Sequence, residues 1–179
     1  MGEAFEPGWE GNISRGLTMP TSSLVMFEEE FKQITVVIDR LLKEANAKVV
    51  FVVDKDGQLI ASSGDTGDID TTSLASLTAG NIAATGGLAK LIGEREFSIL
   101  FHEGERDNLH ISIVAQRVIL VVIFDQKSSL GLVRLRVKKA SDELNTILQK
   151  LLQRVEKKPS DQENLLSEIT DGDIDKLFH

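Results

Sequence analysis

Apolar and small residues recur at helical spacing over residues 71–92 and form two stripes of different kinds. The large-residue stripe suits the core of a domain and consists of Leu74, Leu77, Ala84, Leu88 and Leu91. The second stripe has almost no side chain and consists of Ala75, Ala79, Ala83 and Gly87, with Gly80 and Gly86 beside it. A glycine inside a helix lowers the stability of the helix by roughly 0.5–1 kcal/mol relative to alanine. We therefore expect these glycines to allow another structural element to approach the helix closely. We therefore predict that this helix packs on its own domain with one face and on a partner with the other.

The remaining apolar pattern predicts two further helices and five strands. The helices are expected over residues 27–45 and from Ser128 or Ser129 to about 155. The strands are expected over residues 48–54, 58–63, 97–102, 109–115 and 118–124. The last strand is apolar throughout, so it should be central and covered on both faces. The pattern predicts a layered α+β fold of order α-β-β-α-β-β-β-α, with a five-stranded antiparallel sheet and helices on both faces.

The two ends of the chain differ from this core in composition. Residues 1–25 contain Gly, Pro and Ser without periodicity, and they read as a disordered extension. Residues 26–157 form the predicted domain. Residues 158–179 form a flexible acidic tail, in which Ile174, Leu177 and Phe178 fall at i, i+3 and i+4. This spacing fits a short amphipathic helix that lies in a partner's groove, and it fits a solvated chain end equally well.

Composition and charge exclude several classes of function. The chain has no cysteine, which excludes disulfides, thiolate zinc sites and cysteine nucleophiles. The net charge is −8 and no basic stripe is interleaved with aromatic residues, so nucleic-acid binding is not expected. No apolar run reaches the roughly 18 residues of a membrane span, and the first residues lack the apolar core of a secretory signal. We expect a cytoplasmic protein.

Candidate catalytic and metal-binding residues are few, and no catalytic site, metal or cofactor is predicted. His102 and His110 lie near the ends of predicted strands, where a surface position is favoured over metal binding. Asp54 and Asp56 precede Gly57, which is typical of a hairpin turn. The predicted last helix carries four basic residues: Arg134, Arg136, Lys138 and Lys139. One of them could act as an arginine finger for a GTPase, or the four could form a solvated helix face. Such fingers usually project from loops, so the solvated face is favoured.

Several segments resemble the roadblock/LC7 domain family, and within it the bacterial MglB group that acts in gliding motility and cell polarity. The resemblance is carried by NAKVVFVVDKDGQLIASSG, DTTSLASLTAGNIAATGGLAKLIGE, FHEG and VILVVIFDQKSSLGLVRLRVKKASDEL. It covers about residues 24–152, and more weakly 169–175. The longer N-terminus departs from the family pattern.

The resemblance implies a homodimer joined edge to edge through the strand at residues 97–102, with the two second helices side by side. It also implies binding of a Ras-like small GTPase of MglA type, with two copies of the chain per GTPase and no catalytic side chain donated. Ala83 and Gly87 match contact positions of the family, and the geometry of the helix adds Ala79, Gly80, Ala84 and Gly86. The tail anchors would be Ile174, Leu177 and Phe178, and the protein could concentrate at a cell pole.

Two alternatives to a GTPase activator remain open from the sequence. A scaffold would bind the GTPase without changing its turnover, and the tail could instead modulate nucleotide exchange. A small-molecule sensor of similar architecture would need a roomy polar pocket, whereas the predicted core is rich in Val, Ile and Leu.

Overall fold

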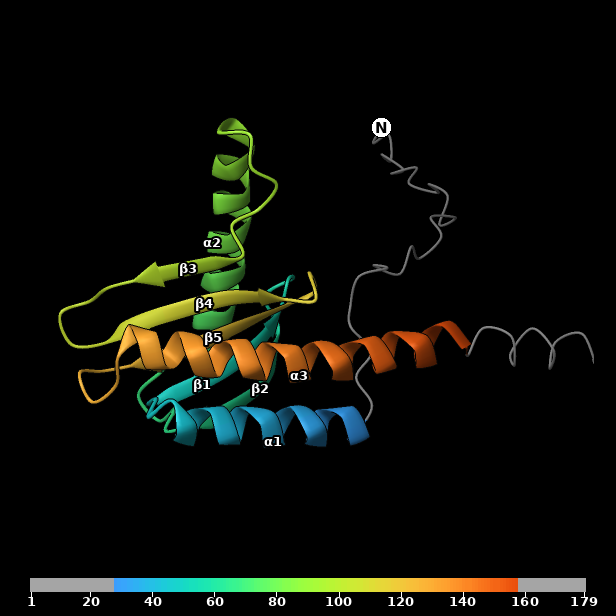
Figure 1. Cartoon of the computed structure of the whole chain (residues 1–179), viewed down its shortest axis with the longest axis horizontal. Helices are drawn as coiled ribbons and strands as arrows, with labels where there is room; N and C mark the ends of the chain where they lie inside the picture. Colours follow the sequence, from blue (N-terminus) through green and yellow to red (C-terminus); the bar gives the residue numbers. More distant parts are fainter. Residues whose placement is uncertain (1–27, 158–179) are drawn as a thin grey trace, which may run out of the picture.

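The computed structural model describes residues 28–157, which form one antiparallel sheet between helices (Figure 1). The elements follow the predicted order: α1 (Glu28–Glu44), β1 (Val49–Asp54), β2 (Leu59–Gly64), α2 (Thr71–Leu91), β3 (Ile99–His102), β4 (Asn108–Val114), β5 (Val118–Phe124) and α3 (Leu130–Lys157). The predicted extension at residues 1–25 and the predicted tail lie outside the described residues.

The sheet has the strand order β2-β1-β5-β4-β3, with every neighbouring pair antiparallel. The central position of β5 is confirmed, since six of its seven residues are buried. The hairpin between β1 and β2 turns at Gly57, whose φ of 87° is costly for any residue with a Cβ. The Oδ1 atom of Asp54 accepts backbone N–H bonds from Asp56 at 3.0 Å and Gln58 at 2.7 Å, so this aspartate serves the turn.

The helices divide into two layers on the two faces of the sheet. The larger cluster of buried residues joins α1 and α3 to one face, through side chains such as Ile38, Val122 and Leu144. The smaller cluster joins α2 to the other face, around Phe51, Ile111 and Val121. Figure 1 shows α1 and α3 side by side and α2 running across the strands. The predicted helices on both faces are confirmed.

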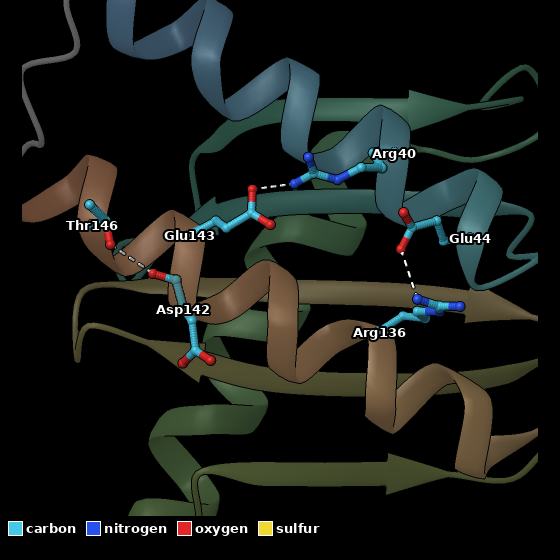
Figure 2. A network of polar contacts seen from close by, with 6 residues as sticks. All are labelled: Arg40, Glu44, Arg136, Asp142, Glu143 and Thr146. Carbon is cyan, nitrogen blue, oxygen red and sulfur yellow. Dashed lines mark hydrogen bonds and ion pairs between the residues drawn. The ribbon is translucent and has the colours of Figure 1, made fainter.

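Ion pairs reinforce the contact between α1 and α3. Arg40 of α1 pairs with Glu143 of α3, and Arg136 of α3 pairs with Glu44 of α1 at 3.2 Å (Figure 2). Glu30 is almost fully buried at the start of α1, where Arg154 donates to it and holds the pKa of its carboxyl below the usual range. The solvated-face interpretation is therefore wrong for Arg136, because this arginine bridges two helices.

Candidate partner-binding face

The start of α2 is fixed by Asp70, which is the N-cap of the helix. Its Oδ1 atom accepts the backbone N–H of Ser73 at 3.0 Å, and its Oδ2 atom accepts the Ser73 hydroxyl at 2.6 Å. The hydroxyl bond is the main reason that the pKa of the Asp70 carboxyl is lowered. These bonds satisfy donors that the first turn of a helix leaves open.

The prediction that the large-residue stripe of α2 enters the core was wrong except at Leu74, which is half-buried against the smaller cluster. The buried residues are Ala75, Thr78, Ile82 and Ala89, while Leu77 is 72% and Leu91 82% exposed, and Leu88 is exposed with them. Large residues already fill the sheet surface beneath the helix, so short side chains let α2 lie close to it. Helical periodicity defines two apolar faces, and it does not indicate which of them meets the sheet.

The predicted small-residue stripe divides between these two environments. Ala75 is buried against the sheet and Ala79 is half-buried, whereas Ala83, Ala84, Gly80 and Gly87 are exposed, and Gly86 is half-buried. Positions four apart drift around a helix by about 40° per step, because one turn contains 3.6 residues. Figure 1 also shows the C-terminal half of α2 extending beyond the β3 edge of the sheet. The second half of the stripe therefore has no sheet beneath it.

The glycines of α2 leave its backbone open. A Cβ atom built on Gly80, Gly86 or Gly87 would meet no atom within 4 Å in the described part of the chain, apart from the backbone of α2 itself. The close approach predicted from these glycines is therefore not made within residues 28–157, and the stripe is accessible to another molecule. The tail residues predicted to join it, Ile174, Leu177 and Phe178, lie outside the described residues.

A large apolar surface accompanies the small residues, and the sequence interpretation assigned it to the core. Leu77, Ala84 and Leu91 follow one another at seven-residue spacing, which is typical of a helix seam that packs on another helix. This spacing is the signal that could have identified an outward face. We call the exposed apolar and glycine residues of α2 the α2 face: Leu77, Gly80, Ala83, Ala84, Gly87, Leu88 and Leu91.

The strand β3 forms one edge of the sheet and begins two residues later than predicted, at Ile99. Within residues 28–157 it pairs only with β4, so its outer edge is available for another strand. Ile99 is half-exposed at this edge. His102 connects the edge to α2, because its Nε2 atom lies 3.1 Å from Nδ2 of Asn81. The α2 face and the open edge therefore adjoin.

The other candidate residues do not gather into a site. His110 is fully buried in β4 beneath α3, which corrects its predicted surface position, and burial lowers its pKa to about 4. Residues 28–157 contain no cluster of three His, Asp or Glu side chains able to hold a metal. A search of the same residues for a helix able to cross a bilayer found none.

Comparisons with known proteins agree with this geometry. The profile of the Roadblock/LC7 domain family matches residues 33–124. The structure of Myxococcus xanthus MglB is 70% identical, with a TM-score of 0.68 over 72% of this chain and 96% of that protein. The gliding protein MglB from Thermus thermophilus is 34% identical, with a TM-score of 0.68 over 72% and 97% of the two chains. An uncharacterized protein of Methanocaldococcus jannaschii is 33% identical over 114 residues, which span 62% of this chain and 98% of that relative. This chain therefore belongs to the roadblock/LC7 domain family and is an MglB-type member of it.

Proposed function

We propose that this protein is a homodimeric activator of a Ras-like small GTPase of the MglA type, acting in gliding motility or cell polarity. Two copies of the chain would engage one GTPase. The observation that carries the proposal is the α2 face, an apolar helix surface that residues 28–157 leave uncovered, in a chain 70% identical to an MglB.

The contact with the GTPase is assigned to the small residues of α2. Ala83, Gly87 and Gly80 let a partner's backbone approach the helix within a few ångströms, with Ala79, Ala84 and Gly86 at the border. Such an approach gains dispersion contacts that a longer side chain would prevent. Ile174, Leu177 and Phe178 of the tail are proposed as a second contact with the same partner.

We propose that this protein activates the GTPase by changing the shape of its active site, without supplying a catalytic side chain. The basic residues of α3 lie on the opposite face of the sheet from α2, so a GTPase bound at α2 is out of their reach. Arg136 is in addition engaged with Glu44. The rate gain would then come from moving the partner's own arginine and glutamine onto the nucleotide, and this chain would perform no chemical step itself.

The homodimer is proposed to form through the open edge of β3. Pairing two β3 edges would extend the sheet across both copies and satisfy the backbone groups of that edge. The same arrangement brings the two α2 helices together, so Leu77, Leu88 and Leu91 would be covered by the second copy. A related solved structure is described as MglB with tetrameric arrangement.

The proposed organisation places the roadblock domain at residues 26–157, between a 1–25 extension and a 158–179 tail. The protein would act in the cytoplasm, concentrated at a cell pole with its GTPase.

The test is GTP turnover by the MglA-type GTPase of the same organism, with and without a two-fold excess of this protein. We expect a large increase with the wild type. Ala83→Arg and Gly87→Arg should abolish both binding and stimulation while the dimer and its melting temperature are retained. The control is Val36→Arg, which places the same side chain on the exposed surface of α1 and should change neither.

The alternative outcomes have distinct meanings. Binding without increased turnover would identify a scaffold and contradict activation. Unfolding of Ala83→Arg would show that this position belongs to a buried interface of the protein itself. Faster release of bound nucleotide at unchanged hydrolysis would identify exchange as the regulated step.

A further inference from the structure

The outer surface of α3 carries cationic side chains that form no ion pair within residues 28–157. Arg134, Lys138 and Lys139 are exposed, and no ion pair joins any of them to another residue of the described region 28–157. By contrast, Arg136 and Arg154 on the same helix pair with glutamates of α1. The unpaired cations therefore form a separate surface, distinct from the contact that holds α3 to α1.

This surface also has an apolar centre. Leu135 is 63% exposed between the cations, whereas Leu144, Leu148 and Leu151 of the same helix are buried in the core. One turn earlier, a Cβ built on Gly131 would meet no described atom within 4 Å outside the backbone of α3, so the surface beside the leucine is open. We call this surface the α3 patch: Gly131, Arg134, Leu135, Lys138 and Lys139. It matches a ligand that is both acidic and apolar.

The chain itself contains such a ligand. The tail from residue 158 onward carries Asp161, Glu163, Glu168, Asp171, Asp173 and Asp175. Its apolar residues Ile174, Leu177 and Phe178 have the spacing of one helical face, with carboxylates around them. The aromatic ring would lie over the open surface at Gly131, and the two aliphatic side chains would lie against Leu135. The carboxylates would lie against Arg134, Lys138 and Lys139.

The tail is also long enough to reach the patch. α3 ends at Lys157, and at 1.5 Å per residue Leu135 lies about 33 Å back along the helix. The connecting residues 158–173 span up to about 50 Å when extended. Tethering raises the effective concentration of the tail at the patch, so modest charge attraction is sufficient for docking.

We propose that the acidic tail folds back along α3 and docks on the α3 patch of its own chain. In the docked state Ile174, Leu177 and Phe178 are covered, and on the proposed function they are then withheld from the GTPase until it competes for them. The α3 patch thereby acts as a resting site for the tail, on the opposite side of the sheet from the α2 face.

The test uses the full chain without the GTPase, so that its failure and the failure of the proposed function are distinguishable. Because the sequence contains no cysteine, His179→Cys places a single spin label at the end of the tail. We expect it to broaden the amide resonances of residues 131–139 several-fold more than those of α1 in 50 mM salt. The broadening should disappear in 0.5 M salt, because exposed charges are screened over about 4–5 Å there.

Charge reversal supplies the matched control. The variant Arg134→Glu/Lys138→Glu/Lys139→Glu should lose the broadening, whereas Lys43→Glu/Lys90→Glu/Arg95→Glu, with the same change in charge elsewhere, should retain it. Broadening that is absent at low salt, or that survives in the α3 variant, would overturn the proposal. A mixture of isotope-labelled chain without the cysteine and unlabelled spin-labelled chain should show little broadening. Equal broadening in that mixture would place the tail on another copy and overturn docking on its own chain.

Discussion

The two helical layers of this protein differ in which apolar residues they bury and which they expose. In the α1/α3 layer, large side chains such as Leu144 and Ile38 enter the core, and ion pairs join the two helices at the surface. In the α2 layer, Ala75, Ile82 and Ala89 are buried, whereas Leu77, Leu88 and Leu91 face outward. The first arrangement completes a domain by itself, and the second leaves apolar area that no other part of residues 28–157 covers. Exposed apolar surface of this kind marks an interaction site.

The comparison predicts that most of the stability resides in the α1/α3 layer. Leu144→Ala should lower the free energy of unfolding by about 3–4 kcal/mol, because Leu144 is fully buried and its removal leaves a cavity. Leu135→Ala, on the exposed side of the same helix, should change it by less than about 0.5 kcal/mol. Denaturant titrations at a fixed protomer concentration measure both values. Similar losses in the two variants would contradict the assignment of the inner and outer faces of α3.

A buried histidine makes the α1/α3 layer sensitive to acid. Neither ring nitrogen of His110 has a hydrogen-bond partner among the described residues, and burial, reinforced by the charge of Arg134, lowers its pKa to about 4. The folded-state pKa is then below the unfolded value, so the unfolded state binds the proton more readily between these pKa values. Stability should therefore fall as the pH drops below about 6.5, with a contribution from His110 of about 1–2 kcal/mol at pH 5.

The check is the difference in unfolding free energy between pH 7.5 and pH 5 for the wild type and for His110→Leu. The leucine variant should show a smaller acid-induced loss by this amount. An unchanged pH dependence would assign the acid sensitivity to other groups.

The smallest expected effect comes from a substitution that tests whether the exposed surface of α2 is uncovered. Gly87→Ala should raise the free energy of unfolding by about 0.5–1 kcal/mol. The added methyl meets no described atom outside α2, and alanine gives the unfolded chain less backbone freedom than glycine does. The contrasting variant is Gly64→Ala. There φ is 101° and the new Cβ would lie 2.3 Å from the Lys48 carbonyl oxygen, so stability should fall. Thermal and denaturant unfolding of both variants test the contrast, and destabilisation by Gly87→Ala would indicate that α2 is already covered in the free protein.

Much of the architecture was predictable because it depends on local patterns. The apolar run of β5 and the turn at Asp54–Gly57 determine their structure through neighbouring residues alone. The capping of α2 by Asp70 is equally local, since its partner Ser73 lies three residues along the chain. The location of the candidate site on residues 71–91 followed from composition, since several glycines in one helix require an explanation.

Other features depended on packing between distant segments. The helical pattern of α2 has two apolar faces, but only the position of the sheet decides that Ala75 and Ile82 are inside and that Leu77 and Leu91 are outside. Arg136 and Arg134 are close in sequence, yet Glu44 of α1 lies beside only one of them. His110 is a buried group because α3 packs against β4. Periodicity is a property of one segment, so the sequence by itself determined the elements and their order. Burial and ion pairing depend on which surfaces of distant segments meet. Only the tertiary structure decided these two features.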